Sequence, residues 1–230
     1  MTDAPEPGRR DRILDAAEHF FAERGFEGAS MREIVQLARV NLATVYYYFG
    51  SKNGLMEAVL KRRFGPLRQE HLALLRSAQK GAKGPLTVEQ ILEAMLLPPL
   101  RLAAHDSAPR QAVMRLVGRI VSEPSPQIQD ILHLQRAEVR EAFLEAFQAS
   151  LPNVPRQDLL WRIEFVWGAL TFILCNPKKI EKDTHGECNP VHSEKVLAEM
   201  IRFFSPGFRV GGKKGAGLPG RRSRGKSRRA

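Results

Sequence analysis

Three adjacent tyrosines, Tyr46, Tyr47 and Tyr48, stand in a short segment whose spacing predicts a helix. Apolar side chains recur there at i, i+3 and i+7, which places them together on the inward face: Leu42, Val45 and Phe49. The same spacing turns Tyr47 and Tyr48 outward and leaves Tyr46 at the border. Because an inert helix would gain nothing from exposed phenol rings, this face is predicted to contact another molecule.

The chemistry of this outward face suits the groove of a DNA duplex. A phenol ring can contact a thymine methyl or a sugar while its hydroxyl bonds a phosphate or a base edge. Three flanking residues lie at predicted helix N-termini, where phosphate is favoured: Ser30, Arg32 and Lys52. The predicted DNA-binding residues are Ser30, Arg32, Asn41, Thr44, Tyr46, Tyr47, Tyr48 and Lys52. The alternative is that the tyrosines pack against neighbouring helices and that Lys52 is only solvated.

Two short predicted helices, residues 31–38 and 42–49, carry this surface. Ser30 followed by Glu33 predicts a capping box at the start of the first helix. The small Ala38 lies where the two helices must approach closely. Two short helices joined by a few residues predict a helix-turn-helix.

Capping and breaking residues predict where the neighbouring helices begin and end. Gly25 can end a helix over residues 9–24 in the left-handed conformation. Asn41 can cap the second helix of the helix-turn-helix, and Ser51 can cap a fourth helix. We expect Gly65-Pro66 to interrupt that fourth helix before it resumes to residue 79.

Helical periodicity continues through the rest of the chain, and no segment alternates as a half-buried strand does, so the fold is predicted to be all-α. A linker is expected at 80–85, and the further helices are expected at 88–97, 109–122, 126–150, 156–174 and 193–204. The two longest carry apolar residues over wide faces that one chain would struggle to cover. This favours a homodimer.

Charge is distributed unevenly along the 230 residues. Nine of the 36 basic residues and none of the 25 acidic residues follow Pro206, so the preceding chain has a net charge of only +2. Residues 206–230 are predicted to form a disordered basic tail, either solvated or adding non-specific phosphate affinity. The absence of long apolar runs and of a signal-like start predicts a cytoplasmic protein without a membrane span.

The segment MREIVQLARVNLATVYYYFGSKNGL, with the helices on either side of it, closely resembles TetR-type repressors over residues 10–64. The resemblance implies an all-α homodimer with an N-terminal three-helix helix-turn-helix domain plus a C-terminal helical ligand-binding and dimerisation domain. It also implies DNA contacts at the matching residues Thr44, Tyr46, Tyr47, Tyr48 and Lys52. We predict boundaries of 9–52 for the DNA-binding domain, 53–205 for the effector-binding and dimerisation domain and 206–230 for the tail.

Two residues depart from the pattern of that family. Arg39 stands where a glycine is usual, and it would cost about 1 kcal/mol if the turn requires a left-handed residue. Gly54 replaces an acidic residue early in the fourth helix, which is predicted to weaken the capping of that helix.

Two later segments, VMRLVGRIVSEP and LLWRIEFVWGAL, resemble the ligand-domain helices of fatty-acid-responsive TetR regulators. This resemblance implies a small apolar effector, such as a fatty acid or acyl derivative. Its binding pocket would be lined by Met114, Val117, Phe143, Phe165 and Trp167. The alternative is that these residues are ordinary core and dimer packing. His133, near Gln129 and Arg136 on one predicted helix, could bond a polar effector group or could simply be solvated.

Other chemical signals are weak. Two cysteines and two histidines supply zinc-type ligands, but their spacing fits no common zinc finger: Cys175, His185, Cys188 and His192. Three glycines from Gly215 to Gly220 spell G-x-G-x-x-G without the strand and helix that a dinucleotide loop needs. No nucleophile with a base can be argued from spacing, so no enzyme, metal or cofactor is predicted.

The sequence therefore predicts a ligand-responsive regulator that binds a palindromic, double-stranded DNA operator, most simply a repressor released by its effector. A constitutive DNA-binding protein aided by its basic tail is the main alternative. A small-molecule enzyme or carrier on the same helical scaffold is a second alternative, and it would be indifferent to changes at the tyrosines.

Overall fold

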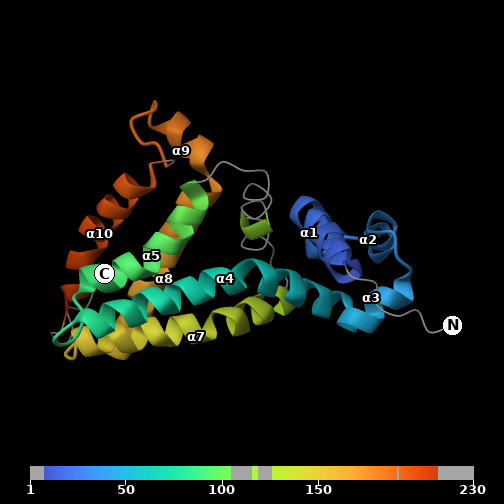
Figure 1. Cartoon of the computed structure of the whole chain (residues 1–230). Coiled ribbons are helices and arrows are strands. Elements are labelled where there is room, and N and C mark those ends of the chain that lie inside the picture. Colours follow the sequence, from blue (N-terminus) through green and yellow to red (C-terminus); the bar gives the residue numbers. More distant parts are fainter. Residues whose placement is uncertain (1–7, 105–115, 119–125, 191, 212–230) are drawn as a thin grey trace, which may run out of the picture.

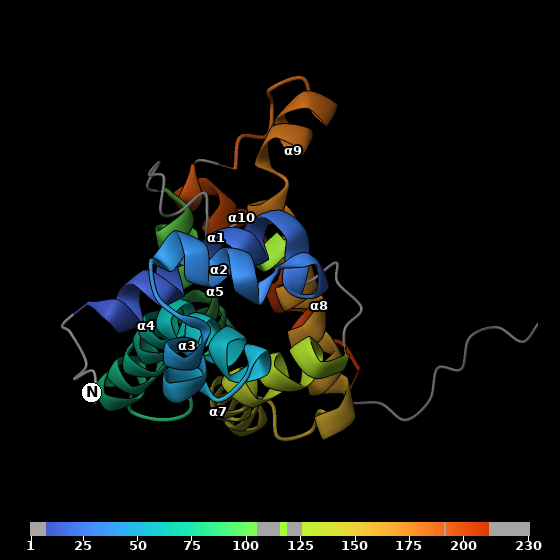
Figure 2. The same cartoon turned by 90° about the vertical axis from the view of Figure 1, so that its right-hand side faces the viewer.

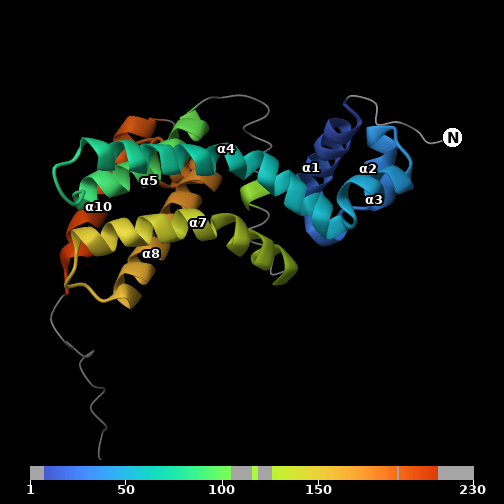
Figure 3. The same ribbon diagram turned by 60° about the horizontal axis from the view of Figure 1, so that its bottom comes forward.

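The computed structural model describes residues 8–104, 116–118, 126–190 and 192–211. These residues form α-helices and no strand, as the sequence predicts. A small head of three helices lies at one end, and one long helix runs from it into a larger helical body (Figures 1 and 3). None of the described helices combines the length and apolar content needed to cross a bilayer.

The head consists of α1 (Arg9–Gly28), α2 (Met31–Ala38) and α3 (Leu42–Phe49). Gly25 has a φ of 73° and a non-helical ψ, so it breaks α1 where the sequence predicts, although one more helical turn follows. The core of the head includes fully buried side chains from all three helices and from the next: Ile13, Leu14, Phe21, Ile34, Val45, Leu55, Met56, Val59 and Leu60.

The turn between α2 and α3 uses a left-handed residue that is not glycine. Arg39 has φ 54° and ψ 48°. Its N–H donates to the carbonyl of Gln36, and the N–H of Val40 donates to the carbonyl of Val35 at 3.1 Å. This pair of bonds is a Schellman motif, which satisfies carbonyls that the end of α2 would leave unpaired. The turn therefore keeps the geometry that a glycine would adopt with less strain.

The predicted caps of α3 and α4 are confirmed. The side-chain oxygen of Asn41 accepts a hydrogen bond from the backbone N–H of Thr44 at 2.7 Å. Ser51 Oγ accepts from the N–H of Gly54 at 3.0 Å, so the start of α4 is capped without an acidic residue. A Cβ on Gly54 would collide with the carbonyl oxygen of Phe49, so the glycine allows the close corner between α3 and α4.

The capping box predicted at the start of α2 is wrong. Ser30 occupies the cap position, but its side chain makes no capping hydrogen bond. Glu33 instead receives two hydrogen bonds from Arg24 Nη1 on α1, each 2.8 Å long. A charged partner from another helix thus takes the carboxylate that would otherwise complete the box.

Helix α4 (Lys52–Gly81) connects the head to the body and continues through Pro66, which corrects the predicted break. A proline clashes with the Cβ of the preceding residue in a helix, and Gly65 has none. Pro66 itself is exposed on α4.

The body is built from α4 and five further described helices: α5 (Val88–Ala104), α7 (Pro126–Ser150), α8 (Arg156–Cys175), α9 (Pro177–Asp183) and α10 (Ser193–Arg209). α4 and α7 lie side by side along its length (Figure 3). α9, which the sequence analysis did not predict, projects from the rest of the body (Figures 1 and 2).

Two helices extend beyond their predicted C-terminal ends, because the additional residues pack against the body. α5 runs through Pro98 and Pro99, both buried, beyond the expected end at residue 97. α10 continues to Arg209, so the first four residues of the predicted tail are helical and Phe208 is buried among core side chains. The remaining tail lies outside the described residues, except for 210 and 211, as does most of the predicted helix at 109–122.

The head is not packed in isolation. Three aliphatic side chains from beyond residue 100 join its core: Leu116, Ile128 and Leu132. Ile128 and Leu132 belong to the first turns of α7, so the long helix pair α4 and α7 reaches the head from the body. The core of the head therefore crosses the domain boundary predicted at residue 52.

Candidate nucleic-acid interface

The outward face of α3 is dominated by two tyrosines. Tyr47 is 80% exposed and Tyr46 is 48% exposed, whereas Val45 between them and the core is fully buried. α3 is thus anchored through Val45 and presents two phenol rings to solvent. Tyr47 faces outward as predicted, and Tyr46, predicted to lie at the border, is more exposed than expected.

Two neighbouring positions differ from the sequence analysis. Tyr48, expected outward, is half-buried against the head core, with its ring 5.4 Å from that of Tyr47 in an edge-on arrangement. Leu42, expected inward, is 39% exposed. Each lies about 60° around the helix from Val45, on opposite sides, so the packing of α3 against its neighbours decides which one is covered. Spacing alone could not distinguish them.

Polar groups at the start of α3 are held in place by one another. Asn41 Oδ1 accepts from both the N–H and the hydroxyl of Thr44, each at 2.7 Å. The acceptor oxygen of Asn41 is therefore used in the cap, and its amide N–H groups are what it can offer to a partner. Ser30 is half-buried and Arg32 is exposed at the start of α2.

Lys52 is neither free nor merely solvated. Its Nζ lies 3.3 Å from the carbonyl oxygen of Glu27 and 4.7 Å from the centroid of the Phe26 ring. The hydrogen bond and the cation–π contact fix the ammonium group where α1 ends and α4 begins. A positive charge held in one position loses little further freedom when it meets a phosphate.

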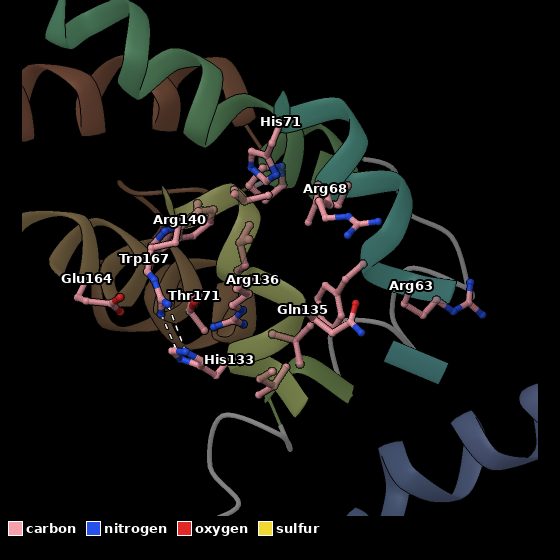
Figure 4. A pocket seen from close by; sticks show the side chains of 18 of the residues that line it. Arg63, Arg68, His71, His133, Gln135, Arg136, Arg140, Glu164, Trp167 and Thr171 are labelled. Atoms are coloured by element: carbon pink, nitrogen blue, oxygen red, sulfur yellow. Dashed lines mark hydrogen bonds between the residues drawn. The ribbon is translucent and has the colours of Figure 1, made fainter. Parts of the chain in front are cut away.

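The body contains a cavity of about 500 Å³ (Figure 4). It is lined from α4, α5, α7 and α8 together with Val117. The lining residues that carry polar groups are Arg63, Arg68, His71, Gln129, Asp130, His133, Gln135, Arg136, Arg140, Glu164, Trp167 and Thr171. A cavity of this size falls within the range of about 300–1,000 Å³ that small-molecule sites occupy.

His71 lies between this cavity and the body core. Its Nε2 is 2.9 Å from the carbonyl oxygen of Met95, and its ring meets those of Phe143 and Trp167 edge-on at 5.9 and 5.6 Å. Burial lowers the pKa of His71 below its ordinary value, more than its bonds to Met95 and Leu67 raise it. The ring is therefore neutral at pH 7 and donates a hydrogen bond to Met95.

A buried carboxylate joins the wall of the cavity to the head. Glu18 of α1 is 3% exposed and accepts from Arg62 Nη2 and Arg63 Nε of α4, each at 2.7 Å. Arg62 Nη1 also donates to Asp15 at 2.8 Å. Because Arg63 lines the cavity, one side chain touches both the hollow of the body and the first helix of the head.

Two family models match the chain. The model of bacterial regulatory proteins of the tetR family matches residues 13–59, and the tetracyclin repressor-like C-terminal domain matches residues 93–207. The second match alone covers half of the chain. The chain belongs to the TetR family. The matched domains are those of DNA-binding transcriptional regulators, not of enzymes.

Individual proteins agree with this assignment. The chain is 31% identical to YttP of Bacillus subtilis over 123 residues, which are 54% of this chain and 55% of that protein. It is 26% identical to the HTH-type transcriptional regulator BetI of Rhizobium meliloti over 64% of this chain and 68% of BetI. The first alignment thus spans little more than half of its relative.

Among solved structures, the fatty acid degradation regulator FadR from Bacillus halodurans has a similar fold. The TM-score is 0.60 with 18% identity, and the match covers 90% of this chain and 99% of FadR. This likeness extends the TetR fold over the body, where sequence resemblance is weaker.

In this TetR-family chain the predicted effector residues are scattered. Val117 and Trp167 line the cavity. Phe143 is fully buried beside His71 and does not reach the hollow. Phe165 is 59% exposed on α8 and stacks on Trp161, and Met114 lies outside the described residues.

Three polar residues that the sequence places on one helix all line the cavity: Gln129, His133 and Arg136. The other arginines there, Arg63, Arg68 and Arg140, were not predicted, nor were the two acidic residues, Asp130 and Glu164. The signal available was spacing: residues 129, 133, 136 and 140 share one face of α7. Among the described residues no three His, Cys, Asp or Glu side chains gather as a metal site would require.

Proposed function

We propose that this protein is a ligand-responsive, sequence-specific repressor that binds a palindromic DNA operator as a homodimer. The observation that carries the proposal is the exposure of Tyr47, 80% of whose surface faces solvent on the second helix of the helix-turn-helix. In such motifs the second helix enters the major groove, where side chains meet base edges. An apolar ring with a hydroxyl can use both kinds of contact there.

We assign the base-reading role to Thr44, Tyr46 and Tyr47, with Tyr48 supporting their ring positions from the half-buried side. Asn41 would offer its amide N–H groups at the groove edge. The phosphate-contacting residues would be Ser30, Arg32 and Lys52. The fixed ammonium of Lys52 supports this role, because a preordered cation sets the register of the head on the duplex.

A second copy of the chain would cover the aromatic surface of the body. Large apolar side chains of α8 and α10 are more than half exposed: Trp161, Phe165, Phe172 and Phe203. A homodimer built on these helices would bury them and would present two heads to successive major grooves, about 34–36 Å apart. Such a regulator would act in the cytoplasm.

The cavity and the Glu18 contact support the response to a ligand. A small, largely apolar effector in the cavity would move Arg63, and Arg63 holds Glu18 of the head. A coupling free energy of about 1–3 kcal/mol would weaken operator binding by about 5- to 150-fold. Repression would then be released.

Selection of bound duplexes from a random pool tests the operator. The proposal expects a partly palindromic sequence whose half-sites are one helical turn apart. Failure to enrich any sequence would favour a constitutive, non-specific DNA binder. Deleting residues 212–230 in the same assay measures the tail, since loss of phosphate contacts would flatten the slope of log K against log salt.

Tyr47→Ala tests the reading face itself. We expect operator affinity to fall by about 10- to 100-fold, while affinity for a random duplex changes little. Tyr47→Phe separates the hydroxyl from the ring. Equal losses on operator and random duplex would contradict the proposed role of Tyr47.

A further inference from the structure

The wall of the body cavity carries more positive than negative charge. Four arginines and two carboxylic acids, Asp130 and Glu164, line it. Three of the arginines already have partners in the described structure. Arg63 is bonded to Glu18, and Arg68 Nη1 lies 3.3 Å from a carboxylate oxygen of Glu138.

The third arginine, Arg140, is occupied by a neighbour on its own helix. Its two terminal nitrogens lie 3.2 and 3.3 Å from the two ring nitrogens of His133. Figure 4 shows this pair, together with Arg136, extending from α7 toward α8. A guanidinium carries five N–H groups, so Arg140 has more donors than its two contacts with His133 can use.

Arg136 is the fourth, and within the described part of the chain no hydrogen bond or ion pair holds it. Glu164 attracts it only from a longer distance. Burial lowers the pKa of Arg136, and the attraction of Glu164 offsets only part of that effect. The guanidinium still stays charged at neutral pH, because arginine is by far the strongest base among protein side chains. A cation enclosed without a paired anion is a site that an anion would stabilise.

Much of the remaining wall is apolar. It includes aliphatic and aromatic side chains from three helices: Leu67, Val139, Trp167, Leu170 and Leu174. A ligand that fills this space therefore needs an apolar body as well as an acidic end. One negative charge is enough, because Asp130 and Glu164 oppose a second.

We propose that the cavity binds an amphipathic organic monoanion, with its carboxylate on Arg136 and its apolar body against Trp167 and the aliphatic wall. This inference rests on the proposed ligand-responsive function and names the class of ligand. Arg140 assists as a second donor to the carboxylate, and Thr171 lies close enough on α8 to line the same end (Figure 4).

The natural reporter of binding is Trp167. The chain has two tryptophans, and Trp161→Phe removes the exposed one, leaving a single indole in the cavity wall. Sodium decanoate, below its micelle concentration, is titrated against this variant while indole emission is recorded. Decanol and decylamine, which share the chain length, provide the neutral and cationic comparisons.

Decanoate is expected to bind at least about tenfold more tightly than decanol, because a charge-assisted hydrogen bond is added to the same apolar contact. Decylamine should bind more weakly than either. Equal affinities for decanoate and decanol, tighter binding of the amine, or no decanoate binding at all would each overturn the proposal. These comparisons need no change at Arg136.

Arg136→Gln is expected to weaken decanoate binding by about 10- to 100-fold and to leave decanol binding unchanged. Arg156→Gln is the matched control and should leave decanoate binding unchanged, since Arg156 of α8 pairs with Glu141 and does not line the cavity. A preference for decanoate that survives in Arg136→Gln would assign the anion to another residue. If Arg136→Gln does not fold, the ligand comparison on the parent protein decides alone.

Operator binding is measured separately so that the two proposals can fail independently. Loss of the decanoate preference with operator binding intact would overturn only the ligand class. Decanoate binding through Arg136 in a protein that selects no duplex would overturn the regulatory function and leave the ligand site standing.

Discussion

The head turns its characteristic polar side chains toward solvent, whereas the body turns its own toward an internal cavity. The head buries an apolar core and turns Tyr46 and Tyr47 outward on a helix of eight residues. The body encloses arginines and His71 around a hollow built from helices far apart in the sequence. One short segment of the sequence is enough to form an exposed contact surface. A cavity, in contrast, forms only when helices from the whole body pack together.

The largest effect is expected where the two regions meet, at Glu18. Glu18→Gln leaves Arg62 and Arg63 facing an uncharged amide in a buried position, and we expect the free energy of unfolding to fall by about 3 kcal/mol. Asp15→Asn is the matched control, because Asp15 pairs with the same Arg62 but is 70% exposed. It should cost no more than about 1 kcal/mol. Urea unfolding of both variants compares them, and equal small losses would mean that Glu18 does not hold the head to α4.

Two glycine-to-alanine substitutions test how tightly the corner between α3 and α4 is packed. Gly54→Ala forces a Cβ against the Phe49 carbonyl and should destabilise the protein by about 1–3 kcal/mol. Gly168→Ala, on α8 of the body, meets no atom within 4 Å and should gain about 0.5–1 kcal/mol. Thermal unfolding distinguishes them, and a Gly54→Ala variant as stable as the parent would show that the corner relaxes freely.

Measuring the free energy of unfolding as a function of pH distinguishes a buried histidine of the body from an exposed histidine of the head. Because the folded pKa of His71 lies below that of the unfolded chain, the unfolded state binds its proton first as the pH falls. Stability should therefore decrease below about pH 6.5, by at most about 1.4 kcal/mol per pH unit for one proton. His71→Gln should remove this part of the slope, and His19→Gln, at an exposed position on α1, is the control. An unchanged slope in His71→Gln would assign the loss to other groups.

The smallest effect concerns the turn of the helix-turn-helix. Arg39→Gly relieves a left-handed conformation and should raise the free energy of unfolding by up to about 1 kcal/mol. Arg32→Gly, in the right-handed helix α2, should lower it by a similar amount. If both substitutions destabilise the protein, the arginine at position 39 contributes contacts that outweigh its backbone strain.

Local signals in the sequence predicted the head well. Asn41 and Ser51 cap their helices as predicted, and Gly25 has the positive φ that was expected of it. The capping box failed because Glu33 pairs with Arg24, nine residues away, and spacing within α2 carries no information about that partner.

The cavity could not be predicted in the same way. Its arginines are separated by up to 77 positions, from Arg63 to Arg140, and only the packing of α4 against α7 brings them to one wall. Trp167 was predicted from the resemblance to fatty-acid-responsive regulators, but Phe143 and Phe165 were predicted in the same way and lie behind and outside the cavity. Hydrophobicity identifies the helices of a body without saying which of their faces meets a hollow.

Leu116, Ile128 and Leu132 complete the core of the head from the other side of a predicted boundary. A chimera that grafts only the first 60 residues onto another regulator would lose these three side chains from the core of the head. Exchange of operator specificity between such proteins should therefore succeed more often when α3 alone is rewritten than when the head is transplanted whole.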